Sequence, residues 1–431
     1  MSDPEDMDNA YGEDEEGEFE LNEDEMVEIG DDEDYVPEGG EGLELEIVDG
    51  DEQDDENEDD IIDDSQEKFM GHNNEPIYAV AVSHKGSQVV SGGGDDQAFL
   101  WTAEKVTGTR VSKHSDSVVA VAFSADDEWI ATGGMDGVVV VKNKATEMKL
   151  EGPGSDIEWV AWHPKHNILL AGSADTTVWM FNIAEEGAMM GVFAGHNDVV
   201  TCGSFTPNGR RVVTGSMDGT LKLWEPNGSN LIHTFGGHGF HEGGVVAMAF
   251  KEGEDPIVAT GGSDGTVCMV RLDTKKILSK FVHKEVSGST RRPAQRQMNE
   301  DGEEEDGEVE EEMDDGVSVE TVVFCPTLPW LVSGGTDGRV IVWDLSVQAK
   351  RSVLVHPDSH AVVRCIFLPQ SVKLITACAD GKVRKYDARS TTLESTLSGH
   401  RDAILDMVLL ADGKRVVTAS DDGTARVFVV G

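Results

Sequence analysis

The chain of 431 residues contains 84 Asp and Glu against 34 Lys and Arg, which gives a formal net charge of −50. Such a field repels nucleic acid, because phosphate binding needs a basic footprint. The sequence has no run of 18 apolar residues and no basic, apolar leader, so it favours neither a membrane span nor secretion.

The acidity is concentrated in two segments. Residues 1–64 hold 33 Asp and Glu and no Lys or Arg, and residues 300–315 hold a further 12. Without these 45, the chain has 39 acidic residues against 34 Lys and Arg, so it carries only about −5 elsewhere. Neither composition buries enough apolar area to offset the entropy of ordering. We therefore expect residues 1–64 to form a disordered acidic arm and residues 285–316 to form an inserted acidic loop.

A nine-residue motif with Asp at its third position recurs eight times after the arm. The first copy, GGDDQAFLW, ends at Trp101, and the fourth, SMDGTLKLW, ends at Trp224. Successive motif aspartates are 41, 39, 43, 46, 73, 43 and 42 residues apart, and the interval of 73 contains the acidic insertion. This period is typical of a four-stranded propeller blade. The motif aspartates are Asp95, Asp136, Asp175, Asp218, Asp264, Asp337, Asp380 and Asp422.

These repeats predict an all-β fold, an eight-bladed WD40 β-propeller over residues 65–431. In each unit the Asp favours a tight turn, and the apolar residues after it favour a strand that is buried on both faces. The eighth unit stops after its third strand, at Gly431. A ring needs its ends joined, because open edge strands promote aggregation. We expect Ser65–Met70 to supply the missing fourth strand.

A polar network is predicted within the blades. Gly-His pairs stand at residues 71–72, 195–196, 237–238 and 399–400, and in most of these units the imidazole precedes a strand Ser or Thr by 18 to 22 residues. Each link of the network satisfies a buried donor. The expected members are His72, Ser91, Asp95 and Trp101 in the first unit, His196, Thr214, Asp218 and Trp224 in the fourth, and His400, Thr418 and Asp422 in the eighth.

The same residue types could form a catalytic Ser-His-Asp set, but repetition in many units favours a structural role, because catalysis needs one site. Two copies are incomplete, since the third has Ala171 where Ser or Thr is expected and the second ends in Lys142. The five cysteines lie far apart without a C-x-x-C spacing, so neither zinc nor disulfides are indicated. We expect no enzyme activity, no metal and no cofactor.

The third unit carries the most distinctive sequence. Its stretch DIEWVAWHPKHNILLAGSADTTVWMF, residues 156–181, resembles the angio-associated migratory cell protein family, as do the acidic leader and the final unit. The resemblance covers about residues 65–431. It implies a eukaryotic cytoplasmic propeller whose fungal relatives are chaperones for one basic ribosomal protein of the large subunit, and whose animal members are associated with cell migration.

Acidic side chains are predicted to gather on one rim of the propeller, where the loops that enter each blade meet the Asp turns. We hypothesise that they form an acidic ring that binds Lys and Arg of a partner, with Trp159 as an aromatic contact for a cation. The alternative is that they are solvated loop charges or turn caps. The acidic ring consists of Glu75, Asp116, Asp156, Glu158, Asp198, Glu242, Glu320, Asp402 and Asp421.

Two functions remain open at this point. The first is a chaperone or assembly factor for a basic protein client, a large-subunit ribosomal protein. The second is a signalling or cytoskeletal scaffold. The acidic arm either keeps the chain soluble or steers a basic client towards it. We expect a cytoplasmic monomer without a membrane partner, because a closed ring has no obligatory partner edge; nuclear entry stays open.

Overall fold

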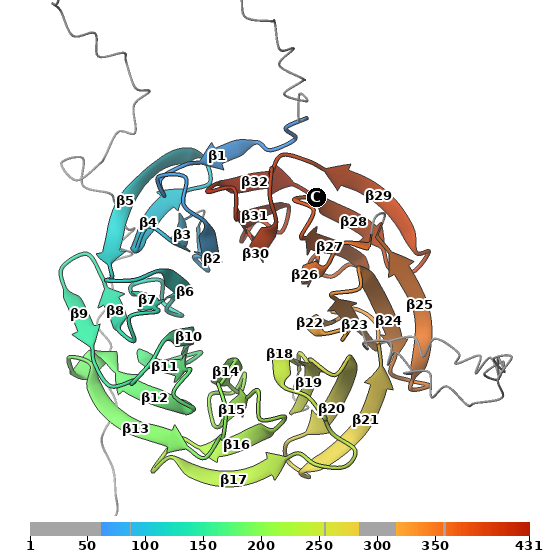
Figure 1. Cartoon of the computed structure of the whole chain (residues 1–431), viewed down its shortest axis with the longest axis horizontal. Coiled ribbons are helices and arrows are strands. Elements are labelled where there is room, and N and C mark those ends of the chain that lie inside the picture. The colour runs from blue at the N-terminus through green and yellow to red at the C-terminus, as the bar shows by residue number, and fades with distance from the viewer. Residues whose placement is uncertain (1–61, 87, 254–255, 284–315, 357–358) are drawn as a thin grey trace, which may run out of the picture.

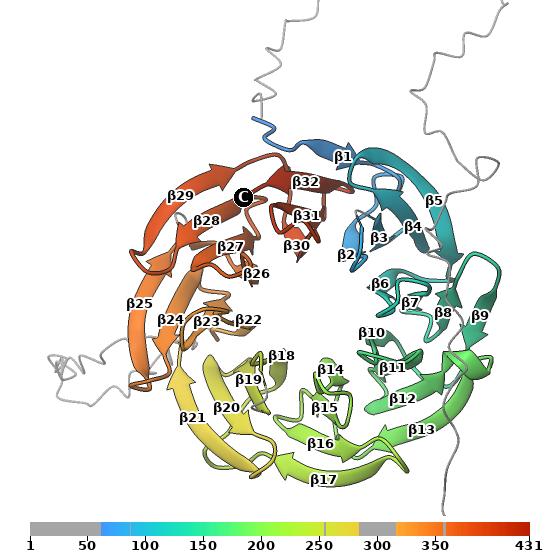
Figure 2. The ribbon, with the colours of Figure 1, turned by 180° about the vertical axis from the view of Figure 1, so that it is seen from behind.

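The computed structural model describes residues 62–86, 88–253, 256–283, 316–356 and 359–431. These residues form eight four-stranded antiparallel sheets arranged as blades around a central channel (Figures 1 and 2). The prediction of an eight-bladed propeller is confirmed. The predicted arm 1–64 and acidic loop 285–316 lie almost wholly outside the described residues.

In every blade the first strand lies next to the channel and the last lies at the outer edge (Figure 1). Blade 1 consists of β2 (Ile77–Val82), β3 (Gln88–Gly93), β4 (Gln97–Thr102) and β5 (Lys105–Lys113), and blade 2 consists of β6 (Val118–Phe123), β7 (Ile130–Gly134), β8 (Val139–Lys142) and β9 (Glu147–Leu150). Blade 3 consists of β10 (Ile157–Trp162), β11 (Ile168–Ser173), β12 (Thr177–Asn182) and β13 (Ala188–Ala194), and blade 4 consists of β14 (Cys202–Phe205), β15 (Val212–Gly215), β16 (Leu221–Glu225) and β17 (Asn230–Phe235). A short 3₁₀ helix, η2 (Ile183–Glu185), joins β12 to β13.

Blades 5 to 8 repeat this plan. Blade 5 consists of β18 (Val245–Phe250), β19 (Ile257–Gly262), β20 (Thr266–Arg271) and β21 (Lys276–Val282), and blade 6 consists of β22 (Val319–Phe324), β23 (Trp330–Gly335), β24 (Arg339–Asp344) and β25 (Ala349–Val355). Blade 7 consists of β26 (Val362–Phe367), β27 (Lys373–Cys378), β28 (Val383–Asp387) and β29 (Thr392–Leu397), and blade 8 consists of β30 (Ile404–Leu409), β31 (Arg415–Ser420), β32 (Ala425–Val429) and β1 (Glu67–Phe69).

The ring closes as predicted, since the fourth strand of blade 8 is β1. Glu67 pairs with Val427 and Phe69 with Ala425, antiparallel. The Phe69 ring is fully buried and stacks on Trp101 of blade 1, with ring centroids 4.9 Å apart. This strand therefore joins the two ends of the chain and also packs against the next blade.

The core lies between adjacent blades. The second strands are almost completely buried, and β19 and β23 have every residue buried. Close packing requires glycine at some positions, because a Cβ on Gly334 would lie 2.7 Å from Val362 of the next blade. Strands buried on both faces explain why the motif is followed by nearly continuous apolar residues.

Antiparallel strands place the turns on two rims. The turns between second and third strands, with the motif aspartates, share one rim with the connections from blade to blade, and we call it the Asp-turn rim. The turns between first and second strands and between third and fourth strands form the opposite rim. No helix in the described part of the chain is long and apolar enough to cross a bilayer.

Candidate functional site on the Asp-turn rim

Blade 4 shows how the rim is built. His196 Nδ1 lies 3.0 Å from an Asp218 carboxylate oxygen and Nε2 lies 2.8 Å from Thr214 Oγ1, which also accepts the Trp224 indole N–H at 2.8 Å. The second Asp218 oxygen accepts from the Thr220 backbone N–H. One residue from the entering loop, one from the second strand and one from the turn are thus locked together.

Blades 1 and 8 contain the same links. His72 joins Asp95 at 2.8 Å and Ser91 at 2.9 Å, and Trp101 donates to Ser91 at 3.2 Å. In blade 8 the network residues are His400, Asp422 and Thr418, at 3.0 and 2.7 Å. Ser91 is fully buried and already accepts the Trp101 indole N–H, so a substrate cannot reach its hydroxyl. This geometry favours a structural role over nucleophilic catalysis.

The histidine of blade 5 differs from the prediction. His238 of the Gly237-His238 pair is exposed, whereas His241 is buried and bonds Thr260 at 2.7 Å and Asp264 at 3.3 Å. The Gly237-His238 dipeptide matches the sequence pattern, but the histidine that the loop places in the network is His241, three residues later. The assignment of His238 to the network is therefore wrong.

Three further histidines were missed because Gly does not precede them. His114 bonds Asp136 and Thr132, and His283 bonds Ser333 and Asp337. The spacing of 18 residues from His114 to Thr132 could have revealed the first. His283 lies 50 residues before Ser333, because the acidic insertion separates them.

The third missed histidine lies in blade 7, where the network is rearranged. His356 Nδ1 lies 3.2 Å from Cys378 Sγ. The turn residue Asp380 instead forms a bidentate ion pair with the buried Arg384, with N–O distances of 2.5 and 3.1 Å. Burial and the nearby Arg384 charge lower the pKa of His356 to about 4. This imidazole is therefore neutral at pH 7.

Burial and hydrogen bonds also set the charges of the regular network. Burial lowers the pKa of His196 and of His400, although an Asp partner opposes the shift in each case. Burial acts to raise the pKa of Asp422, but bonds from His400 and Thr424 outweigh it and hold the pKa far below its usual range. In blades 4 and 8 these shifts favour a neutral imidazole that donates to an ionised carboxylate.

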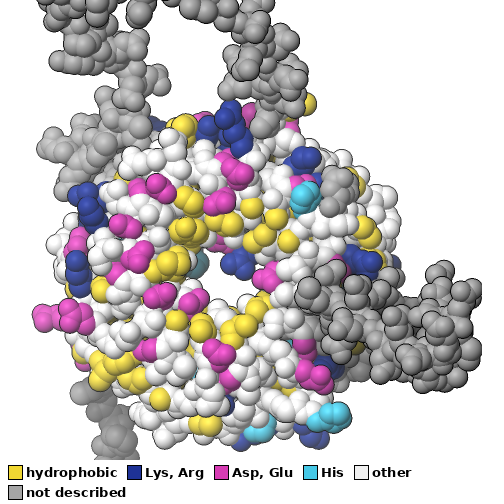
Figure 3. Space-filling view, in the orientation of Figure 1, with side chains coloured by type: hydrophobic (Ala, Val, Ile, Leu, Met, Phe, Trp, Pro, Cys, Tyr) yellow, Lys and Arg dark blue, Asp and Glu magenta, His cyan; other side chains and the backbone are white. Residues whose placement is uncertain are grey.

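All nine carboxylates of the acidic ring lie on the Asp-turn rim or at the channel mouth beside it. Seven lie on the entering loops or next to the turn Asp, and Glu158 and Glu320 are the second residues of β10 and β22, where the strand register shifts. A register shift leaves one residue unpaired and turns its side chain. Figure 3 shows one face of the propeller, with acidic and hydrophobic side chains around the central opening and a Lys or Arg side chain at the opening itself.

None of the nine carboxylates forms an ion pair with a Lys or Arg of the described residues. The opposite rim differs, since Glu225 pairs with Arg211 and Asp412 with Arg415. Burial and the neighbouring Asp156 charge raise the pKa of Glu158. The acidic ring thus has no ion pair within 4.0 Å among the described residues, although the charge of Asp406, and with it that of Glu320, raises the pKa of Arg364.

Trp159 is held between two blades. Its indole N–H donates to the Val200 carbonyl at 2.8 Å, and a Cβ on Gly172 or Gly203 would collide with its ring. The side chain is half-buried, so only its remaining exposed surface is open to a ligand.

Other chemistry has little support at this site. All five cysteines are free, and the described residues contain no group of three or more His, Cys, Asp or Glu that could hold a metal ion. The arrangement of the rim can bind cations through exposed carboxylates.

Comparison with protein families matches seven segments of the chain, against eight blades in the structure. The family described as WD domain, G-beta repeat matches residues 64–102, 105–141, 145–182, 187–225, 229–270, 314–344 and 391–428. The strands β26, β27 and β28 lie between the last two matched segments, and they belong to the blade whose network is rearranged.

Similar proteins are known in animals and fungi. Human angio-associated migratory cell protein is 32% identical over 371 residues, which cover 85% of this chain and 80% of that protein. The ribosome assembly protein SQT1 of Saccharomyces cerevisiae is 24% identical and covers 84% of this chain and 86% of its own.

Among solved structures, Saccharomyces cerevisiae Sqt1 matches with a TM-score of 0.73 at 21% identity, covering 86% of this chain and 99% of its own. Chaetomium thermophilum Sqt1 bound to the N-terminus of the ribosomal protein L10 matches with a TM-score of 0.71 at 23% identity, covering 86% of this chain and 100% of its own. These structures share the fold. On the repeats and the 32% identity, the chain belongs to the angio-associated migratory cell protein family of WD-repeat propellers.

Proposed function

We propose that the protein is a non-enzymatic binding platform that chaperones a basic protein client, a ribosomal protein of the large subunit, in the cytoplasm. The observation that carries this proposal is the set of nine carboxylates without an ion-pair partner among the described residues. Lys and Arg side chains of a client would supply the missing countercharge through charge-assisted hydrogen bonds. Pairing would also relieve the repulsion between Glu158 and Asp156.

The relatives support the class of client. One fungal relative is named a ribosome assembly protein, and a structure of similar fold is bound to the N-terminus of the ribosomal protein L10. Unassembled ribosomal proteins are rich in Lys and Arg, so an acidic surface can mask them until they meet RNA. The local acidity of this chain agrees with that need.

Charge reversal on the rim tests the proposal. We expect Glu158→Lys, Glu320→Lys and Asp421→Lys together to weaken binding of a Lys- and Arg-rich ribosomal peptide at least about tenfold, about 1.4 kcal/mol. The matched control reverses Glu128, Glu185 and Asp273 on the opposite rim, which changes the net charge equally. The proposal fails if a folded triple variant binds with unchanged affinity, or if the control loses as much.

The second candidate is a signalling or cytoskeletal scaffold linked to cell migration, which the name of the 32% identical human relative favours. Affinity purification at low and high salt, followed by mass spectrometry, separates the two. One basic ribosomal protein that is lost at high salt supports the chaperone. Several unrelated receptors, kinases or cytoskeletal proteins at comparable amounts support the scaffold.

A further inference from the structure

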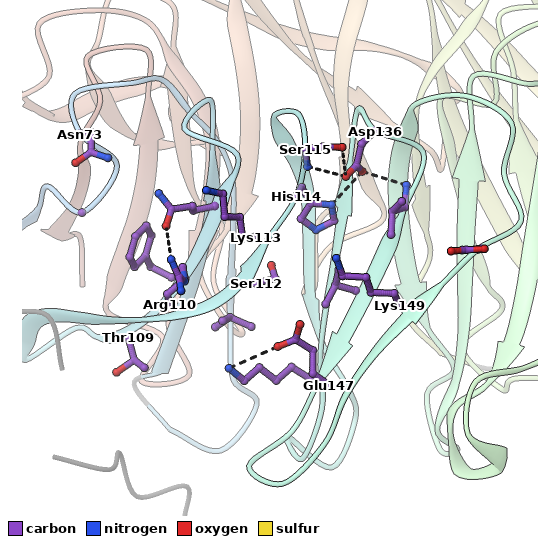
Figure 4. Close-up of a pocket in the computed structure, with 18 residues that line it drawn as sticks. Asn73, Thr109, Arg110, Ser112, Lys113, His114, Ser115, Asp136, Glu147 and Lys149 are labelled. Carbon is purple, nitrogen blue, oxygen red and sulfur yellow. Dashed lines mark hydrogen bonds and ion pairs between the residues drawn. The ribbon is translucent and has the colours of Figure 1, made fainter. Parts of the chain in front are cut away.

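A groove of about 1050 Å³ lies between blades 1 and 2 (Figure 4). At the Asp-turn rim it reaches Ser115, the neighbour of Asp116 in the acidic ring. Its walls come from β4 and β5 of blade 1 and from β8 and β9 of blade 2, and Gly71 and Asn73 line it where the chain enters blade 1.

The groove lies beside the blade whose motif ends in Lys142. In blades 1 and 4 an indole at this place donates to the strand Ser or Thr. In blade 2 the hydroxyl of Ser112, from the neighbouring blade, lies 2.9 Å from Thr132 Oγ1 instead. A hydroxyl satisfies the hydrogen bond but fills far less volume than an indole, so space remains between the two outer strands.

The groove is basic although the protein is strongly acidic. Arg110, Lys113, Lys142 and Lys149 line it, and Arg110 and Lys113 face Lys149 from opposite sides in Figure 4. Of these four, only Lys142 has an ion-pair partner among the described residues, Glu147 at 4.0 Å.

Three carboxylates also face the groove, one fewer than its four cations. They are Glu147, Glu151 and Asp136. Asp136 is occupied by His114, by the backbone N–H groups of Ser115 and Val138 and by the Ser115 hydroxyl. Three cations of the groove therefore have no carboxylate partner in the described part of the chain.

We propose that this groove is a docking site for the acidic N-terminal arm of the same chain, residues 1–61. The arm contains 31 Asp and Glu and no Lys or Arg, so its charge is complementary to the groove. Residues 62–70 join the end of the arm to Gly71, which lines the groove, although Asp63 and Asp64 themselves lie beside Arg426 of blade 8 and Ser398 after blade 7.

Because the arm and the groove belong to one chain, weak contacts between them are sufficient for docking. A flexible chain of about 60 residues has a root-mean-square reach of roughly 40 Å, and short tethers give effective concentrations near the millimolar range. Docking would bring carboxylates of the arm to Arg110, Lys113 and Lys149. The contact is electrostatic, so salt weakens it.

Zero-length carbodiimide coupling of the full chain tests the proposal, since it joins a carboxylate to a lysine amine only where the two touch. We expect amide links from residues 1–61 to Lys113 and Lys149 to exceed links to Lys165 and Lys414 several-fold. The two control lysines are exposed on the opposite rim. The excess should vanish at about 0.5 M salt, where the Debye length falls to about 4 Å.

A mixture of isotope-labelled and unlabelled chains separates links within one molecule from links between copies. Arm links that are spread evenly over all four lysines, or that join different copies only, overturn the proposal. In the variant Arg110→Glu with Lys113→Glu, links to Lys149 should fall several-fold. The matched variant Lys165→Glu with Lys414→Glu, which has the same net charge, should leave them unchanged; an equal fall in both variants also overturns the proposal.

Discussion

Blades 4 and 2 differ at one position of an otherwise common network. Both have the turn Asp, the buried imidazole and the strand Thr, but the nine-residue motif ends in Trp224 in blade 4 and in Lys142 in blade 2. In blade 2 the Ser112 hydroxyl replaces the indole as hydrogen-bond partner of Thr132. The comparison shows that satisfying the strand hydroxyl and filling the space beside it are separate tasks. In blade 2 the strand hydroxyl has its hydrogen-bond partner, but the space beside it is not filled and forms the groove.

The largest expected contrast is between the two residues themselves. Trp224→Ala should destabilise the protein by about 3–5 kcal/mol, because it empties a fully buried site and leaves Thr214 without a donor. Lys142→Ala should cost less than about 0.5 kcal/mol, as at a surface position. Guanidinium unfolding followed by circular dichroism measures both. Equal losses would refute the separation of roles.

The next contrast removes the turn Asp. Asp218→Ala in blade 4 should cost about 2–3 kcal/mol, since His196 and the backbone N–H groups of Asn197 and Thr220 all lose their acceptor. Asp175→Ala in blade 3, where no histidine contacts the Asp, should cost about 1 kcal/mol. The same unfolding measurement applies. A larger loss in blade 3 would contradict a stabilising role for the imidazole.

Acid should weaken the network through its neutral histidines. The folded pKa of His356 is about 4, below the value of about 6.5 in an unfolded chain, so the unfolded state binds the proton first as the pH falls. Stability that is present above pH 6.5 is therefore lost towards pH 4, by about 2 kcal/mol between pH 7 and pH 5. His356→Gln should reduce this loss by that amount. An unchanged pH dependence would show that His356 does not contribute.

The smallest effect tests the substitution of one hydrogen bond for another. Ser112→Ala should cost about 1 kcal/mol in the natural sequence, because Thr132 loses a partner. In a Lys142→Trp background the indole N–H should serve Thr132, so the cost of Ser112→Ala should fall to near zero. A double-mutant cycle measures the difference. Equal costs in both backgrounds would show that the new indole does not reach Thr132.

The sequence predicted the parts of the fold that repeat. Eight turn aspartates at a nearly constant interval predicted the blades, and the missing strand after Gly431 predicted the pairing of Ser65–Met70. The Gly-His pattern did not identify the network histidine of blade 5, because the length of the entering loop decides which side chain is buried there. His238 was selected for its Gly partner, but His241 occupies the site.

The groove and the balance of charge on the two rims could not be read from the sequence. Lys142 was visible as an exception, but Ser112 belongs to the preceding blade, and only the folded chain brings it to Thr132. Likewise, the carboxylates of the acidic ring are the same residue types as Glu225 and Asp412 on the opposite rim. What separates them is the absence of a Lys or Arg ion pair within 4.0 Å among the described residues, which depends on tertiary structure.

The closure of the ring by β1 has a consequence for biosynthesis. The strand that completes blade 8 is made first, yet its partner β32 ends at Val429, two residues before the last. At about 5–20 residues per second, roughly 20 to 70 seconds pass between the synthesis of the two strands. During that time Phe69 lacks its partner Ala425. The ring therefore closes only after β32 has been made, and until then the nascent chain presents an open arc with two uncapped ends.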